Sequence, residues 1–317
     1  MTAITSLGGG HGLFATLRAV RRIAEDVTAV VTVADDGGSS GRLRRELGQI
    51  PPGDLRMALA ALSAEDERGK LWEEVLQHRF GGTGALAGHA VGNLIIAGLT
   101  SVLGSEVAAL DEVGSLLGIY GRVLPMSPLP LDIEAEVVGL EYDARVVRPV
   151  RGQVAVATTP GQVRRIRLIP EQPPATPDAV EAILAADMVT LGPGSWFTSV
   201  LPHLQVPELV QALRDTTAHR VVVLNLSSEP GETAGFSSER HLHMLAQHAP
   251  DLTLDTILVD ESTMSGPSER GYLERAAATL SAEVVYADVR ELDDDGGRTE
   301  RHDPVKVASA LGELLAR

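Results

Sequence analysis

The fold is decided by residues 4–42, ITSLGGGHGLFATLRAVRRIAEDVTAVVTVADDGGSSGR. A short apolar run, Ile4–Leu7, leads into GGGHG at residues 8–12, and a second run, Val27–Val33, leads into ADDGGSSGR at residues 34–42. Runs that are apolar on both faces are typical of central strands in parallel sheets. Glycine lets the backbone approach a ligand, and the N–H groups at the following helix start attract an anion. Two such units in succession predict an α/β protein that holds a nucleotide or a nucleotide sugar.

Strand-like and helix-like runs alternate along most of the chain. The further candidate strands are Met188–Leu191, Val221–Leu224, Thr256–Val259 and Glu283–Tyr286. The candidate helices are Leu13–Glu25, Pro177–Ala185, Val206–Leu213, Glu239–Gln247, Arg270–Ser281 and Val305–Leu315, the last with Asp303 as N-cap and Pro304 at N1. The alternation predicts an α/β fold, a Rossmann-like doubly wound parallel sheet, in a single domain over residues 1–317.

Two regions depart from this alternation. Residues 43–117 look all-helical, and we expect a helical insertion that caps the first two loops. Residues 132–169 contain short runs in which apolar and polar residues alternate, at Ile133–Val137, Val154–Val156 and Ile166–Leu168. Such alternation is typical of antiparallel strands with one wet face, so we expect a small antiparallel β region there.

Composition excludes several classes of function. The chain has 317 residues and a net charge of −16, which argues against nonspecific nucleic-acid binding. It contains no cysteine, which excludes disulfides, thiol catalysis and cysteine-based metal sites. The N-terminus lacks the long apolar region of a signal peptide, and no stretch reaches the roughly 18 apolar residues of a membrane span. We therefore expect a cytoplasmic protein without membrane insertion.

The first two loops carry the strongest candidate ligand-binding residues. The first departs from the dinucleotide fingerprint G-x-G-x-x-G, so a tight turn without a ligand is the alternative, and His11 alone is weak evidence because loop histidines are usually solvated. In the second loop, Asp35 and Asp36 could accept hydrogen bonds from a ribose or base, or coordinate Mg²⁺. The hydroxyl groups of Ser39 and Ser40 could donate to phosphate. An Asx-turn followed by a helix cap would use the same residue types.

Further candidates lie along the rest of the chain. Asp54 follows the rigid turn PPG at residues 51–53 and is either a helix N-cap or a ligand acceptor. Asn93 sits in an apolar helical run where a buried amide needs partners, which a ligand could supply. A third strand end leads into Gly192-Pro193-Gly194-Ser195, where Ser195 begins a helix. It differs from a serine-hydrolase elbow, because Phe197 replaces the closing glycine. Asn225 opens a fourth polar segment, which is either another loop on the same rim or a simple connection.

The loops after four predicted strands should open on one edge of the sheet. In parallel sheets, ligands bind outside the carboxyl ends of the strands, at the point where the strand order reverses. This convergence carries more weight than any single loop.

With these residues in view, the chain resembles the gluconeogenesis factor family (YvcK-like proteins), within the superfamily of 2-phospho-L-lactate transferase (CofD-like). The resemblance runs from the first glycine loop to RHDP at residues 301–304. Its most specific stretches are TVADDGGSSGRLR at 32–44, PPGD at 51–54, GH and GNL at 88–94, GPGS and TS at 192–199, and PGET at 230–233. The family usually has Asn where Met57 stands, and Met-Thr-Gln in place of Ser227-Ser228-Glu229, which puts polar contacts at those positions in doubt.

The resemblance implies binding of a UDP-sugar, UDP-N-acetylglucosamine or UDP-glucose, and a cytoplasmic role in cell shape and envelope synthesis during gluconeogenic growth. It brings no established catalytic activity and no required cofactor. The transferase relatives join a phospholactyl-type group from a guanosine diphosphate donor to a deazaflavin and use Mg²⁺, so an Mg²⁺-dependent transferase is the alternative hypothesis.

In the first hypothesis, Gly8, Gly9, Gly10, Gly194 and Ser195 hold the diphosphate. Asp35, Asp36 and Asn93 contact ribose, base or a metal, and Arg42 offsets phosphate charge. The full set of expected ligand-binding residues is Gly8, Gly9, Gly10, His11, Asp35, Asp36, Gly37, Ser39, Ser40, Arg42, Asp54, Asn93, Gly192, Gly194, Ser195 and Asn225. A homodimer and a regulatory protein partner in envelope synthesis are the expected assemblies.

Overall fold

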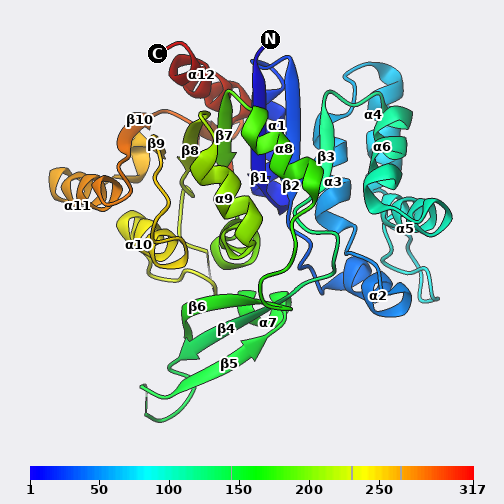
Figure 1. Cartoon of the computed structure of the whole chain (residues 1–317), viewed down its shortest axis with the longest axis horizontal. Coiled ribbons are helices and arrows are strands. Elements are labelled where there is room, and N and C mark those ends of the chain that lie inside the picture. Colours follow the sequence, from blue (N-terminus) through cyan, green and yellow to red (C-terminus); the bar gives the residue numbers. More distant parts are fainter. Residues whose placement is uncertain (144, 230, 265) are drawn as a thin grey trace.

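A seven-stranded parallel sheet forms the centre of the molecule (Figure 1). The computed structural model describes residues 1–143, 145–229, 231–264 and 266–317, so Pro230 of the PGET stretch lies outside the described residues. The strand order is β10-β9-β8-β7-β1-β2-β3, and every neighbouring pair is parallel. The order therefore reverses between β1 and β7, as in a doubly wound Rossmann-like sheet. The predicted fold class is confirmed.

The elements have the following bounds. The strands of the main sheet are β1 (Ala3–Gly8), β2 (Asp26–Val31), β3 (Arg122–Pro125), β7 (Met188–Leu191), β8 (His219–Val223), β9 (Thr256–Asp260) and β10 (Glu283–Ala287). The smaller sheets contain β4 (Asp132–Val138), β5 (Val147–Arg151) and β6 (Gln162–Ile169), and the hairpin of β11 (Arg290–Leu292) and β12 (Arg298–His302). The α-helices are α1 (Gly10–Val20), α2 (Gly38–Leu47), α3 (Gly53–Leu62), α4 (Glu67–Gln77), α5 (Val91–Leu103), α6 (Glu106–Leu117), α7 (Gln153–Ala157), α8 (Pro177–Ala185), α9 (Pro207–Asp215), α10 (Ser238–His248), α11 (Pro267–Ala278) and α12 (Pro304–Leu315). The short helical segments are η1 (Trp196–Val200), η2 (Leu201–Gln205) and η3 (Glu261–Thr263).

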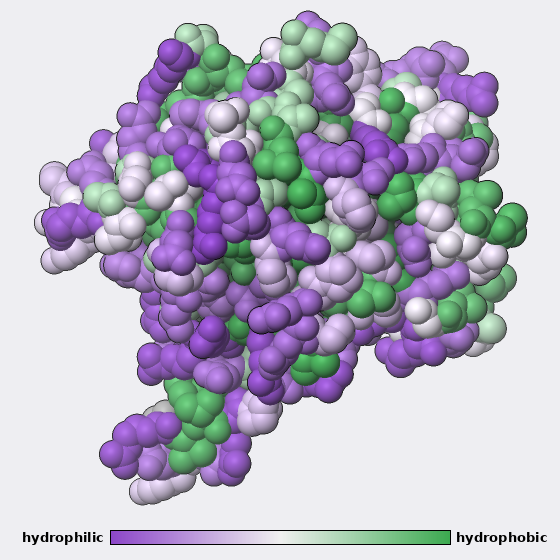
Figure 2. All heavy atoms as spheres, viewed as in Figure 1, coloured by the Kyte–Doolittle hydropathy of each residue, from purple (hydrophilic) through white to green (hydrophobic). Residues whose placement is uncertain are grey.

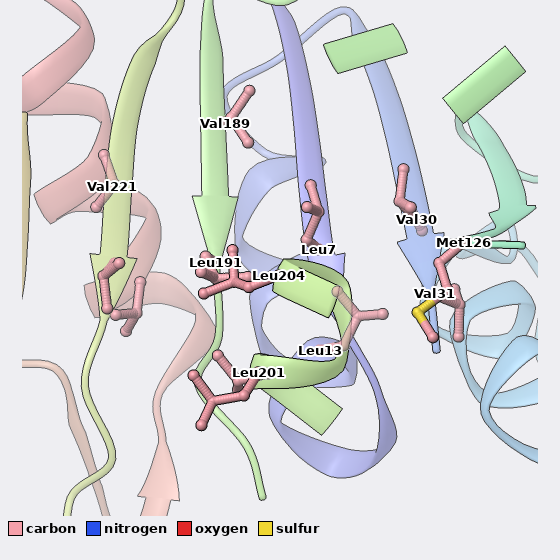
Figure 3. Close-up of a cluster of buried hydrophobic side chains, with 14 of the residues drawn as sticks. Leu7, Leu13, Val30, Val31, Met126, Val189, Leu191, Leu201, Leu204 and Val221 are labelled. Atoms are coloured by element: carbon pink, nitrogen blue, oxygen red, sulfur yellow. The ribbon is translucent and has the colours of Figure 1, made fainter. Parts of the chain in front are cut away.

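The core is aliphatic and surrounds the central strands. Figure 3 shows Leu7 and Leu191, from adjacent strands, meeting Leu13 of α1 and Leu204 of η2. These side chains are almost completely buried. Truncating a fully buried leucine such as Leu7 to alanine removes transfer energy and leaves a cavity, at a cost of about 2–5 kcal/mol.

The helical region lies along the β3 flank of the sheet (Figure 1). Within residues 43–117, α3 packs against α1, β2 and the edge strand β3, and α6 also packs against β3. Helices α4 and α5 pack onto α3 and α6 from outside. Residues 78–90 interrupt the helices as a loop closed by a bridge between Arg79 and Ala90. The region therefore buries one flank of the sheet, and α2, the N-terminal end of α3 and the start of α5 come next to the loops at the carboxyl edge.

The antiparallel sheet β5-β4-β6 lies beyond the carboxyl edge of the main sheet (Figure 1). Its strands match the predicted antiparallel region, but the prediction that Val154–Val156 alternates as a strand is wrong, because these residues belong to α7. Gly152, with φ of 104°, ends β5 in a conformation that favours glycine, and the Asp36 carboxylate then accepts from the Val154 amide at 3.0 Å. A three-residue pattern cannot distinguish a strand from one helical turn.

Three strands were not predicted, and helix α1 begins earlier than expected. The unpredicted strands are β3, β11 and β12, which have only three to five residues each. Helix α1 starts at Gly10, inside the first glycine loop, so the loop is itself the helix N-terminus. The predicted cap of α12 is confirmed, because Asp303 accepts from the amides of Val305 at 2.7 Å and Lys306 at 3.2 Å.

The face shown in Figure 2 is largely hydrophilic, with hydrophobic residues scattered among hydrophilic ones. Within the described ranges, no helix combines the length and apolar character needed to cross a membrane.

Candidate functional site

The first and third glycine loops interlock where the strand order reverses. A Cβ on Gly12 would lie 2.1 Å from the carbonyl oxygen of Pro193, so the two loops touch backbone to backbone. The Thr16 hydroxyl lies 3.2 Å from the Gly12 oxygen and 3.3 Å from the Gly192 oxygen, and so bridges them. We call residues 8–12 and 192–195 the switch-point loops.

Asn225, just after the end of β8, holds one of these loops in place. Its Oδ1 accepts from the Gly194 amide at 3.0 Å, and its Nδ2 donates to the Gly194 oxygen at 2.9 Å. Both polar ends of the amide are thus occupied by the loop. The structure gives Asn225 a positioning role, with its hydrogen bonds directed at Gly194.

A cavity of about 840 Å³ opens beside the switch-point loops. Helix α1, the end of β8 and the β11–β12 hairpin form its walls. Its lining residues are His11, Gly12, Phe14, Ala15, Pro193, Gly194, Asn225, Leu226, Ser227, Ser228, Glu229, Glu291, Glu300, Arg301, His302 and Pro304. The volume lies in the range of small-molecule and cofactor sites.

A buried network of polar side chains lies on the other side of the first glycine loop. Asn93, on α5, donates from Nδ2 to the Ser39 hydroxyl at 3.0 Å and accepts at Oδ1 from Arg56 Nε at 2.9 Å. The Ser39 hydroxyl also lies 2.9 Å from Nδ1 of His89. We call this group, with Ser40, Asp35 and Asp54, the polar cluster.

The polar cluster and the neighbouring Thr32 contain atoms without partners. Among the described residues, nothing hydrogen-bonds to Asp54 Oδ2, Arg56 Nη1 or Thr32 Oγ1, although all three atoms are buried. A Cβ on Gly9 would lie 2.6 Å from both Asp54 Oδ2 and Thr32 Cγ2, so these groups press directly against the first glycine loop. Leaving a buried polar atom unpaired costs about 1–3 kcal/mol, so a bound ligand or water is needed to complete this site.

The charges of the cluster are set by burial. Burial first, and the nearby Asp35 carboxylate second, raise the pKa of Asp54 to about 7. Burial also raises the pKa of Asp35. Burial lowers the pKa of Arg56 to about 10, which still leaves the guanidinium charged at neutral pH. The cluster therefore offers one cation and a carboxyl group that changes between donor and acceptor near neutral pH.

A carboxyl pair, Glu229 and Glu232, stands behind the third loop. Glu232 is buried, and its Oε2 accepts from the Phe197 amide at 3.2 Å. Burial raises the pKa of Glu232 to about 7, and the Glu229 carboxylate contributes to the rise. Burial also raises the pKa of Glu229, against a hydrogen bond from Ser195. The pair thus places two carboxyl groups with raised pKa values beside Ser195, a predicted ligand residue.

Two predicted ligand residues point elsewhere. The Asp36 carboxylate bonds to the Val154 amide of α7, so it faces the small sheet. Arg42 donates to the Ala87 oxygen at 2.7 Å, in the loop before α5. Both side chains have structural partners, which leaves Asp35 as the carboxylate of the second loop that faces the polar cluster.

The other predicted residues fall into two neighbouring groups. Those at the switch-point loops are Gly8, Gly9, Gly10, His11, Gly192, Gly194, Ser195 and Asn225. Those at or next to the polar cluster are Asp35, Gly37, Ser39, Ser40, Asp54 and Asn93, with the Gly37 amide donating to Asp35 at 2.9 Å. Their direct ligand contacts stay a prediction.

Several residues of these sites were not among the predicted ligand residues, and four of them are buried polar or charged side chains. Three of them, Arg56, His89 and Glu232, lie inside or next to the stretches that carry the family resemblance. These residue types are common on protein surfaces, so the sequence alone did not single them out. Their burial is the distinguishing signal. His302 came from the unpredicted hairpin, and the RHDP stretch was the one hint of it.

Comparisons with a family model, with known proteins and with solved structures all place this chain in one family. The model of the family 2-phospho-L-lactate transferase CofD matches residues 4–304. A Bacillus subtilis protein named gluconeogenesis factor is 37% identical over 322 residues, which are 98% of this chain and 98% of that protein. A protein of Mycobacterium tuberculosis H37Rv that carries the same name provisionally is 62% identical over 314 residues, 99% of this chain and 90% of that protein.

A solved structure shares the fold over its full length. The crystal structure of a UPF0052 family member from Bacillus halodurans superimposes with a TM-score of 0.85 at 34% identity. The match covers 98% of this chain and 99% of that chain.

Proposed function

This chain belongs to the CofD family, and we propose that within it the protein is a cytoplasmic nucleotide-sugar-binding factor that regulates cell shape and envelope synthesis during gluconeogenic growth. The ligand is a UDP-sugar, UDP-N-acetylglucosamine or UDP-glucose. The name gluconeogenesis factor, carried by full-length relatives, supports the physiological part of the proposal.

One observation carries the binding part. The interlocked glycine loops stand at the strand-order reversal, between the 840 Å³ cavity and a buried cluster that contains unpartnered polar atoms. Ligands of open α/β sheets bind at this place. A diphosphate there would accept from the backbone amides at the start of α1, and a nucleoside and a sugar would extend to either side of it.

Different residues of the site would have different roles in binding. Gly9 and Gly10 bring the backbone against the diphosphate, and Asn225 keeps the Gly194 backbone in its bound shape. Arg56 supplies a buried positive charge behind the loop. Because these groups are held by hydrogen bonds already, little ordering is needed on binding, which favours affinity.

An Mg²⁺-dependent phospholactyl-type transferase is the second candidate, and one observation favours it. Asp35 lies close enough to Asp54 for its carboxylate to raise the pKa of Asp54, and Oδ2 of Asp54 lacks a partner in the described part of the chain. Carboxylate oxygens are the ligands that Mg²⁺ prefers, so these two residues fit the ion better than the adjacent Asp35 and Asp36. When bound, the ion would neutralise the charge of a diphosphate group.

Calorimetric titration separates the two candidates. The protein is titrated with UDP-N-acetylglucosamine and with GDP, each with and without Mg²⁺. We expect the UDP-sugar to bind and GDP to bind at least about tenfold more weakly, a difference of about 1.4 kcal/mol. Preference for GDP in the presence of Mg²⁺, followed by turnover with a deazaflavin acceptor, would instead establish the transferase.

The polar cluster provides the matched variants. Asn93→Ala should weaken UDP-sugar binding because it releases Ser39 and Arg56, whereas Gln49→Ala, a change at an exposed contact with Ser101, should not. Unchanged affinity in Asn93→Ala would remove the polar cluster from the site.

A further inference from the structure

The β11–β12 hairpin is a fixed wall of the cavity. Arg290, at its base, donates from Nη1 to the Thr299 oxygen and from Nη2 to the Leu226 oxygen, both at 3.0 Å. Its Nε lies 3.6 Å from the buried carboxylate of Asp260, at the end of β9. The hairpin is therefore tied to the ends of β8 and β9, and its side chains hold their places beside the switch-point loops.

The charge of the cavity is unbalanced. Three glutamates, Glu229, Glu291 and Glu300, line it, against Arg301 as its one lysine or arginine among the described residues. Arg301 is already paired, because its Nε donates to Glu291 at 2.5 Å. Glu300 accepts from the Ser227 hydroxyl, which leaves its charge uncompensated by any cation that the structure describes.

The remaining polar groups of the cavity are neutral. Ser227 and Ser228 supply hydroxyls, and His302 is 9% exposed with no described partner for its Nε2. Burial lowers the pKa of His302 to about 4, so the imidazole is uncharged at neutral pH. Carboxylates, hydroxyls and a neutral imidazole can hydrogen-bond a polyol, whereas an anion would find no free cation among the described residues here.

We propose that this cavity selects the sugar of the bound nucleotide: it takes a neutral, hydroxyl-rich hexose and rejects a hexose that carries a carboxylate. The inference rests on the proposed function, because it assumes that the diphosphate lies on the switch-point loops. The hydroxyls of a hexose can donate to Glu300 and Glu229, and the unpaired His302 Nε2 adds a further polar contact. A carboxylate at the same place would stand against these glutamates, and like charges placed next to each other disfavour binding.

UDP-glucose and UDP-glucuronate provide a direct test, because they differ only in the oxidation of C6 from a hydroxymethyl group to a carboxylate. Calorimetric titrations of the full chain with both, and with UDP as a reference, should give at least about tenfold weaker binding of UDP-glucuronate. The difference should shrink at high ionic strength, since it is electrostatic.

Glu291→Gln is the informative variant. It removes one negative charge and frees Arg301, so it should narrow the gap between the two ligands severalfold, mainly by strengthening UDP-glucuronate. Glu313→Gln, an exposed change on α12 away from the cavity, should leave the gap unchanged. Thermal melts of each variant show that it is folded.

Each outcome decides between the claims. Equal binding of UDP-glucose and UDP-glucuronate would refute the proposed preference for a neutral sugar, while the proposal of nucleotide-sugar binding would still stand. A gap that persists unchanged in Glu291→Gln would also overturn the assignment to these residues. Binding of neither ligand, nor of UDP-N-acetylglucosamine, would overturn the proposed function and this inference with it.

Discussion

Replacing Glu232 by glutamine should make the free energy of unfolding less dependent on pH. Glu232 is 3% exposed, its Oε1 has no partner among the described residues, and burial raises its pKa to about 7 from an ordinary value of 4.5. Between these two values the folded state keeps a proton that the unfolded state releases. Raising the pH through this window therefore costs stability, and the loss levels off above the folded pKa.

The size of the effect follows from the two pKa values. Linkage gives a loss of about 2 kcal/mol for the wild type between about pH 5.5 and about pH 8. The glutamine side chain would keep the hydrogen bond from the Phe197 amide, because an amide oxygen accepts as a carboxylate oxygen does. Glu232→Gln should not show this pH-dependent loss of stability, so near the upper end of the pH range it should be more stable than the wild type.

Urea denaturation across this pH range, followed by circular dichroism, measures the difference. The two proteins should differ least near the acidic end of the range, which serves as the internal control. Parallel stability curves for wild type and Glu232→Gln would refute the raised pKa. A variant that is less stable than the wild type at the alkaline end would show that the charged form of Glu232 has a partner.

The remaining predictions concern the loops, the small sheet and the hairpin. Gly12→Ala should destabilise the fold by about 1–3 kcal/mol or more in thermal melts, because the new Cβ would collide with the Pro193 carbonyl. Gly98→Ala is the control: the site lies inside α5 with free space around it, so this change should stabilise the fold by about 0.5–1 kcal/mol. Asp36→Ala should lower the free energy of unfolding by about 1 kcal/mol and reduce amide-exchange protection in α7, because the Val154 amide loses its acceptor. Asp36→Asn keeps an acceptor oxygen and should lose little stability. An equal loss in both variants would show that the charge of Asp36 matters. Arg290→Leu should cost about 1–3 kcal/mol in urea denaturation, because the buried Asp260 carboxylate loses its cation and keeps only its bonds from Ser262 and the Val289 amide. A second change, Asp260→Asn, should recover part of this loss, and no recovery would show that the two side chains are not coupled.

The sequence predicted the central strands and their shared edge because both depend on local signals. Val/Ile-rich runs followed by glycine need no knowledge of distant residues, and the strand order at β1 and β7 then follows the general rules for α/β sheets. The short strand β3 and the β11–β12 hairpin lack such signals, because their stability comes from partners elsewhere, such as the Arg290 contacts with β8 and β9.

The sequence identified which residue types belong to the site, but it predicted only in part which way their side chains point. Asp35 and Asp36 are chemically identical neighbours, yet the backbone directs one toward the polar cluster and the other toward α7. Arg56 and Glu232 carry ordinary surface side chains, and only the packing of α5 and of the third loop buries them. Orientation and burial are tertiary properties, which a motif does not contain.

The pairing of β1 with β7 has a consequence for the timing of biosynthesis. Ile4 pairs with Met188, and the far wall of the cavity arrives only with His302, close to the C-terminal end of the chain. A nascent chain would therefore expose its first glycine loop long before the loop acquires its counterpart. Because a ligand stabilises only the form that binds it, a ligand held between these loops and the hairpin would stabilise only molecules in which all of them have folded together. Ligand occupancy would then report that the two ends of the sheet have met.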